Sequence, residues 1–180
     1  MPSRNFKYAV ALLLLSRLPV LAQDAGCSAL KRVLHGAPSF SVVRGPRSSD
    51  MVDLAIDQNV GTKTYESTVA LFGSKNCRVT IDSTGNEFSC KWDYSDDSDE
   101  ALQDQGQKFA NLVGSCLALS SSPNKHSRDS KTSSSSYVDW DFTWSQESVN
   151  LTVTVSARVA VTTRTGKTRR SLSVTVKSDQ

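Results

Sequence analysis

Residues 77–94 read CRVTIDSTGNEFSCKWDY and carry the clearest structural signal in the chain. Apolar and polar residues alternate strictly over residues 77–82 and again over residues 88–94, a period typical of strands with one buried face. The residues between these two runs are of the types that form tight turns. The stretch therefore predicts a β-hairpin with one buried face. Seven residues lie on that face: Cys77, Val79, Ile81, Phe88, Cys90, Trp92 and Tyr94.

A long helix is predicted directly after the hairpin, over residues 98–119. Asp97 is placed as its N-cap, and Glu100 three residues later completes a capping box. Apolar residues then recur at intervals of three and four, so one stripe of the helix packs across the buried face of the hairpin. The stripe consists of Ala101, Gln105, Phe109, Leu112, Val113 and Cys116.

Three further strands are predicted toward the C-terminus. Residue types alternate over residues 137–144, 149–161 and 171–177. The last two of these strands form a hairpin, because the connection between them has Gly166 at its centre. Residues 120–136 contain nine serines and cannot bury apolar surface, so this segment is predicted to be a mobile loop.

The N-terminal half has weaker patterns. Residues 27–37 place apolar side chains at helical spacing and predict a short helix. Residues 40–44 and 64–72 read as extended, and residues 47–63 as mostly loop. The expected fold is an α+β domain with a mostly antiparallel sheet of five to seven strands. The short N-terminal helix and the long central helix pack on one face of that sheet.

The first residues have the features of a secretory signal. A basic start with Arg4 and Lys7 precedes the apolar run 8–15, and residues 20–22 fit a cleavage site. We expect residues 1–22 to be a signal peptide and residues 23–180 to be one domain, secreted or periplasmic, with no membrane span after cleavage. Two alternatives are a membrane anchor and a lipid on Cys27. Removal of residues 1–22 takes away three cations and no acid, so the formal charge of +3 falls to zero.

The four cysteines predict two disulfides, because all of them follow the cleavage point. A two-residue turn at Thr84–Gly85 or Gly85–Asn86 sets Cys77 opposite Trp92 or Tyr94 rather than Cys90. The long helix runs back over the second strand of the hairpin, which brings its end toward the start of that strand. The preferred pairs are therefore Cys27 with Cys77 and Cys90 with Cys116.

Two groups of charged residues are candidates for binding. The polar face of the sheet leaves Asp139, Asp141, Arg158 and Lys177 available to partners. The last hairpin carries a basic cluster, which suits an anionic surface or a partner protein. Its members are Arg158, Arg164, Lys167, Arg169, Arg170 and Lys177.

Enzyme chemistry has little support in the sequence. The cysteine spacing and the two histidines indicate no metal site, and no motif indicates a cofactor. A hydrolase needs His35 or His126 as its base, and neither lies in a recognisable motif. The basic cluster has no interleaved aromatic residues, so nucleic-acid binding is not favoured.

The best hypothesis is a small exported binding domain that is not an enzyme. Its partner is a protein or an envelope component, bound through the exposed sheet face and the basic hairpin. The alternatives are a secreted hydrolase with an unrecognised site and a lipid-anchored structural protein of the envelope.

Overall fold

The computed structural model describes residues 18–48, 62–74, 76–94, 98–118, 122–146 and 150–179. These residues form two α-helices and one antiparallel sheet, which confirms the predicted α+β class. The sheet has eight strands instead of five to seven, because the serine-rich segment adds a strand. The helices are α2 (Leu18–Gly36) and α3 (Asp99–Cys116). The strands are β1 (Arg44–Arg47), β2 (Lys63–Ser67), β3 (Asn76–Ile81), β4 (Gly85–Asp93), β5 (Asn124–Lys131), β6 (Ser135–Gln146), β7 (Leu151–Thr162) and β8 (Thr168–Asp179).

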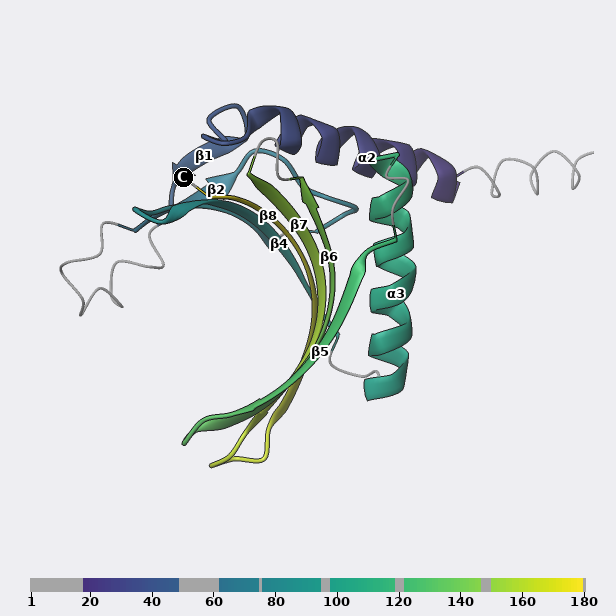
Figure 1. Ribbon diagram of the computed structural model, residues 1–180, viewed down its shortest axis with the longest axis vertical. Helices are drawn as coiled ribbons and strands as arrows, with labels where there is room; N and C mark the ends of the chain where they lie inside the picture. The colour runs from purple at the N-terminus through teal and green to yellow at the C-terminus, as the bar shows by residue number, and fades with distance from the viewer. Residues whose placement is uncertain are drawn as a thin grey trace, which may run out of the picture.

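The order of strands across the sheet is β1-β2-β3-β4-β8-β7-β6-β5. The C-terminal strand β8 therefore lies in the middle and joins the N-terminal half of the sheet to the C-terminal half. The sheet is strongly bent, and both helices lie on its convex side (Figure 1). This agrees with the expectation that both helices pack on one face. The concave face is not covered by either described helix.

Alternation along the long strands separates a buried face from a polar one. In β7, Val153, Val155, Ala157 and Val159 are buried, whereas Thr152, Thr154 and Ser156 face the concave side and remain partly exposed. β8 has the same pattern. The apolar side chains form one core between the sheet and the helices. Its largest fully buried members include Phe40, Phe88, Leu30, Leu71, Leu102 and Leu172.

The buried stripe of α3 differs from the prediction by about one position. The buried residues of α3 are Leu102, Gly106, Ala110, Val113 and Cys116, while Ala101 and Gln105 are exposed. Gly106, the smallest of these residues, lies where the helix is very close to the sheet. A Cβ atom on Gly106 would lie 2.9 Å from the Cβ of Ala157.

Two other details of α3 follow from its position. The N-cap is Ser98, whose hydroxyl accepts a hydrogen bond from the N–H of Ala101 at 3.1 Å. Asp97, the predicted cap, lies outside the described residues. Phe109 lies at the side of the helix, with its ring 5.1 Å from that of Phe72 and 4.9 Å from that of Trp92.

The predicted hairpin is present as β3 and β4, but its register differs from the expected one. The carboxylate of Asp82 accepts hydrogen bonds from the N–H of Thr84 at 2.7 Å and of Gly85 at 3.0 Å. This side-chain turn makes the loop longer than two residues. It sets Ile81 opposite Asn86, and as a result Cys77 lies opposite Cys90.

The preferred pairing of the cysteines is wrong. The disulfides are Cys27–Cys116 and Cys77–Cys90. The second bridge follows from the register, because the two residues are direct cross-strand neighbours with Cα atoms 4.0 Å apart. The first bridge joins the two helices, since the end of α3 reaches α2 rather than the start of β4 (Figure 1).

The sequence predicted a loop over the whole serine-rich segment, but part of this segment is a strand. Residues 124–131 form β5, which pairs with β6 over its whole length, and Thr132–Ser134 make the turn. The prediction failed because β5 has no apolar alternation, all eight of its residues being exposed. Backbone pairing with β6 supplies the order that side-chain burial does not.

The N-terminal part also departs from the expected boundaries. α2 begins at Leu18, well before the expected residue 27, and β2 ends at Ser67. Residues 40–43 form turns instead of a strand, because Phe40 has a φ of 51° and buries its ring in the core. Of the predicted signal peptide, residues 1–17 lie outside the described residues. Most of the predicted loop 47–63 lies outside them as well.

Candidate functional site

The concave face is the described surface that best fits a binding role, since its side chains are polar and neither helix covers it (Figure 1). Register places these side chains in rows that cross the strands. Asp139 lies opposite Arg158, and Asp141 lies opposite Ser156. We use the name concave face for Tyr137, Asp139, Asp141, Thr143, Thr152, Thr154, Ser156, Arg158, Ser171, Ser173, Thr175, Lys177, Glu87, Ser89 and Lys91.

Several groups on the concave face are held by one another. The hydroxyls of Thr143 and Thr154 lie 3.2 Å apart. The Ser156 hydroxyl donates to the Asp141 carboxylate at 2.5 Å. Ser171, which lies between Asp93 of β4 and Arg158 of β7, is buried although it is polar. The face therefore presents donors and acceptors in fixed positions, which lowers the entropy lost on binding.

Arg158 and Asp139 form an ion pair on the concave face. Arg158 Nε lies 2.6 Å from Asp139 Oδ1, and Nη2 lies 3.1 Å from Oδ2, so the contact is bidentate. The hydrogen bond to Asp139 is the main reason that the pKa of Arg158 is raised. The guanidinium also lies 5.5 Å from the centre of the Tyr137 ring. Asp139 was predicted to be available to partners, but it is buried and its charge is already paired.

Arg158→Ala is expected to lower the free energy of unfolding by about 2 kcal/mol. The value falls between those of exposed and buried pairs because the Arg158 side chain is 53% exposed and that of Asp139 only 8%. Urea unfolding measures the loss. Arg164→Ala is the matched control, since Arg164 is an exposed cation and its removal should change stability by less than about 0.5 kcal/mol. Equal losses in the two variants would contradict the structural role of the pair.

Glu87 lies on the same face, opposite Lys177 of β8. Burial raises the pKa of its carboxyl above the ordinary value of 4.5, and the hydrogen bond from Ser89 and the charge of Lys177 only partly oppose this. The folded protein therefore holds the Glu87 proton more tightly than the unfolded chain does. Protonated Glu87 therefore contributes to stability. This contribution is complete below the ordinary pKa of 4.5 and is lost as the pH rises through the raised pKa of the folded protein.

Glu87→Gln is accordingly expected to stabilise the protein at pH 7, where the native carboxylate is charged. The gain should be below about 1 kcal/mol, since solvent still reaches part of the side chain. It should disappear below the ordinary pKa of 4.5, where both versions are neutral. Thermal melts of both proteins across this range measure the effect. A gain that is independent of pH would show that packing, and not charge, is responsible.

The predicted basic cluster is not one patch in the structure. Arg170 faces the helix side, where its Nη2 lies 2.7 Å from the Asp99 carboxylate at the start of α3. Lys177 pairs with Asp179 at 2.9 Å, and this contact raises its pKa. Arg158 belongs to the pair described above. Three cations remain exposed around the β7–β8 turn, and we call them the basic tip: Arg164, Lys167 and Arg169.

The β7–β8 turn, which carries the basic tip, is closed by backbone hydrogen bonds. The N–H of Gly166 donates to the carbonyl of Thr162 at 2.8 Å, with Gly166 at a φ of 63°, a conformation that favours glycine. A shallow cavity of about 340 Å³ lies beside the turn and is lined partly by Lys167 and Arg169. Asp93 also lines it, so the cavity is not purely cationic.

Among the residues that the structure describes, the histidines do not form the arrangement that a serine hydrolase needs. His35 and His126 are both exposed. His126 lies opposite Asp141, which in turn bonds to Ser156. The carboxylate thus stands between the imidazole and the hydroxyl, whereas a catalytic triad has the imidazole in the middle.

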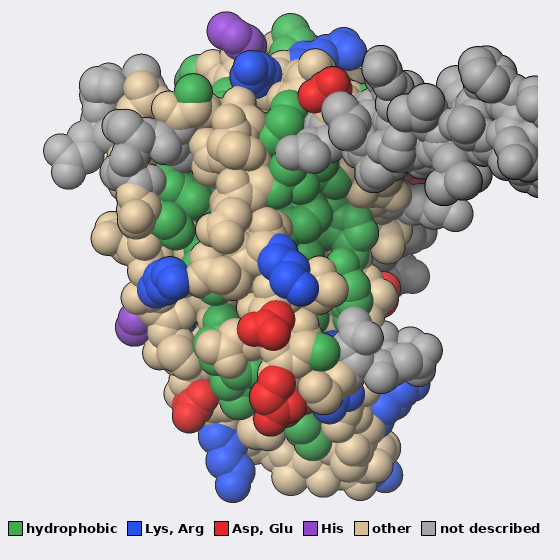
Figure 2. Space-filling model, turned by 90° about the vertical axis from the view of Figure 1, so that its right-hand side faces the viewer, with side chains coloured by type: hydrophobic (Ala, Val, Ile, Leu, Met, Phe, Trp, Pro, Cys, Tyr) green, Lys and Arg blue, Asp and Glu red, His purple; other side chains and the backbone are tan. Residues whose placement is uncertain are grey.

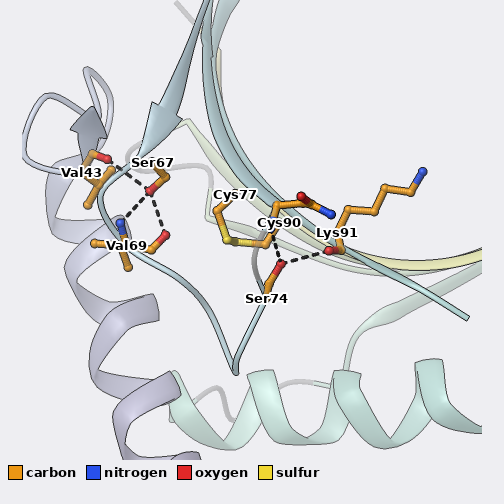
Figure 3. Close-up of a disulfide and its surroundings, with 8 residues drawn as sticks. Val43, Ser67, Val69, Ser74, Cys77, Cys90 and Lys91 are labelled. Carbon is orange, nitrogen blue, oxygen red and sulfur yellow. Dashed lines mark hydrogen bonds between the residues drawn. A yellow bond between two sulfur atoms is a disulfide. The ribbon is translucent and has the colours of Figure 1, made fainter. Parts of the chain in front are cut away.

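The region around the Cys77–Cys90 disulfide contains a second polar cavity, of about 340 Å³. Figure 3 shows that Ser67 and Ser74, which line this cavity, form hydrogen bonds with backbone groups. The Ser67 hydroxyl accepts from the N–H of Val69 at 2.9 Å, and the Ser74 hydroxyl donates to the carbonyl of Lys91 at 2.9 Å. These groups hold residues 68–74 where the chain leaves the sheet, so we assign them a structural role.

The described part of the chain contains neither a metal-binding cluster nor a membrane-spanning helix. Among those residues, no three side chains of His, Cys, Asp or Glu come together in a way that could hold a metal ion. None of the described helices is long and apolar enough to cross a membrane. The sulfur of Cys27 is in a disulfide, so it is not free to form the thioether of a lipoprotein anchor.

Comparisons with protein-family models, with curated proteins and with solved structures found no match for this chain. The assignment of a site therefore rests on geometry alone. The feature that sequence reasoning missed is the β5 edge, since a strand without apolar residues has no periodic signal. The eight residues of β5 contain neither proline nor glycine, and this was the one available hint.

Proposed function

We propose that this chain is an exported, disulfide-bonded binding module that holds a partner protein on its concave face. The observation that supports this proposal best is the two-sided sheet. Its convex face is covered by helices, and its concave face presents fixed hydroxyls and charged pairs. Export is supported by the predicted signal peptide and by two disulfides, which are typical of oxidising compartments.

A protein partner fits this face better than a polysaccharide does. Sugar rings usually stack on exposed aromatic side chains, and the aromatic residue of the concave face is Tyr137, whose ring is already in contact with Arg158. The concave face instead presents opposite charges and hydroxyls at the spacing of the strands. These groups suit a polar protein surface, whose side chains and backbone supply complementary charges, donors and acceptors. The basic tip extends the surface toward acidic parts of such a partner.

Photocrosslinking in the cells that make the protein tests this proposal. A photoreactive amino acid at Thr154, in the middle of the concave face, should capture a protein. The same group at Lys108, an exposed residue of α3, is the matched control and should capture none. The captured protein, once purified, should bind the native chain and should bind Thr154→Lys at least about tenfold more weakly, since the longer side chain and its unpaired charge would have to be accommodated at the centre of the contact.

Two results would contradict the proposal. One is a captured partner that binds Thr154→Lys as tightly as the native chain. The other is crosslinking of the same protein from Lys108, which would place the partner on the helix side. Capture of a polysaccharide from Thr154 would also contradict a protein partner and would indicate that the concave face binds an envelope polymer.

A further inference from the structure

The strand β5 forms one edge of the sheet and pairs with β6 on one side only. In an antiparallel ladder, every second residue of an edge strand directs its N–H and C=O away from the neighbouring strand. The register runs without interruption from Asn124–Thr143 to Lys131–Ser136, so the edge is regular. All eight residues of β5 are exposed. Its outer backbone groups are thus a template on which another strand can pair.

The opposite edge of the sheet lacks this property. β1 has four residues, includes Pro46, and pairs with β2 through a shifted register. Short strands, proline and irregular register are the usual protections of a sheet edge. β5 has none of these three, and its protection consists of charge alone.

The charge along β5 is mainly positive and continues into the basic tip. β5 carries Lys125, Arg128 and Lys131 against a single acid, Asp129. The β5–β6 turn touches the β7–β8 turn, because the N–H of Thr163 donates to the carbonyl of Ser134 at 2.9 Å. The two hairpins end together in Figure 1, and Figure 2 shows basic side chains at this lower end of the molecule.

A cavity lies beside β5 on the helix side of the sheet. Its volume is about 380 Å³, and Gln103 and Gln107 of α3 line it together with Lys125 and Trp140. Side chains of an added strand would alternate between this cavity and the concave side. The glutamines offer both donors and acceptors, and Trp140 offers an apolar wall. Asp104 also lines the cavity, so the ligand's acidic side chains should lie nearer the basic tip than α3.

We propose that β5 binds an extended, acidic segment of another polypeptide by strand addition. The backbone of β5 supplies the hydrogen bonds, and Lys125, Arg128, Lys131 and the basic tip select for carboxylates. This site shares the basic tip with the proposed function, but its backbone contacts lie on the β5 edge and not on the concave face, so either proposal can fail without the other. A second copy of this chain is a poorer occupant, because it would bring two positive strands together.

A synthetic octapeptide of alternating glutamate and threonine, labelled with a fluorophore, is the probe that tests this. Fluorescence anisotropy should show saturable binding to the intact chain, weaker when salt rises from about 0.1 M to about 1 M, where screening lengths fall from about 10 Å to about 3 Å. A peptide of equal charge with a proline at its centre should bind at least about tenfold more weakly, since proline removes ladder hydrogen bonds.

Matched variants locate the site. Lys125→Glu with Arg128→Glu should weaken binding at least about tenfold, because like charges then face the peptide. Lys63→Glu places a single charge reversal of the same kind on β2, near the other edge, and should have no effect. All three replaced residues are exposed, so circular dichroism should show native folding. Amide hydrogen exchange should slow in β5 and not in β1 when the peptide binds.

The proposal is overturned if the proline peptide binds as well as the alternating one, which would indicate charge attraction alone. It is overturned equally if the Lys63→Glu and Lys125→Glu/Arg128→Glu proteins lose the same affinity, or if no peptide binds. Light scattering that shows a dimer broken by the Lys125→Glu/Arg128→Glu change would assign the edge to a second copy instead.

Discussion

Replacement of Cys27 and Cys116 together by alanine is expected to lower the free energy of unfolding by about 4 kcal/mol. This bridge closes a loop with a sequence separation of 89 residues, so its loss releases a large chain entropy in the unfolded state. It also joins α2 to α3, which are otherwise held mainly by packing. Urea unfolding of the double variant and of the native chain measures the difference.

The other bridge serves as the matched comparison. Cys77 and Cys90 are separated by 13 residues, so their joint replacement by alanine should cost about 3 kcal/mol. Each variant is also compared with the native protein under reducing conditions, which separates the loss of the cross-link from the loss of buried sulfur. A larger cross-link contribution from Cys77–Cys90 than from Cys27–Cys116 would contradict the loop argument.

Phe88→Ala is expected to destabilise the protein by about 4 kcal/mol, because it leaves a cavity at the centre of the core. Phe88 is fully buried, and its backbone lies between Val79 of β3 and Val176 of β8. Its ring also lies 6.5 Å from that of Phe40, which follows α2. The truncation therefore loosens both halves of the sheet and the segment after the first helix.

Ser89→Ala is the control for this prediction, since Ser89 is the next residue on the same strand and faces the concave side. Its cost should be no more than about 1 kcal/mol, the value of a typical hydrogen bond. Thermal or chemical unfolding of the two variants decides the matter. Similar losses would mean that β4 does not have one buried and one polar face.

Alternation in the sequence predicted β3, β4, β6, β7 and β8 well, and it predicted which side of each strand is buried. The reason is that side chains alternate between the two faces of a strand, and only one face here is apolar. The polar residues of the candidate site were identified by the same argument. Their availability was not, because a pattern shows the face of Asp139 but not its pairing with Arg158.

The basic cluster shows a similar limit. Proximity in sequence suggested that Arg158, Arg170 and Arg164 form one surface. Because side chains alternate between the two faces of a strand, these residues are separated: Arg158 lies on the concave face, and Arg170 contacts Asp99 on the helix side. Arg158, Arg170 and Lys177 each pair with a described acid, whereas the turn residues Arg164, Lys167 and Arg169 are exposed cations outside these pairs. A closer count of strand positions could have predicted this division, but the acid partners could not be predicted.

The sequence by itself determined the fold class, the two helices and the two faces of the sheet, because these depend on local periods of hydrophobicity. Tertiary structure decided the remaining features. The Asp82 turn selects the register that pairs Cys77 with Cys90, and the meeting of α2 and α3 pairs Cys27 with Cys116. Close contact with the sheet selects the small residue Gly106 of α3. Backbone hydrogen bonds to β6 make a strand of residues 124–131, which bury no apolar side chain. Such contacts join distant parts of the chain, so no local pattern records them.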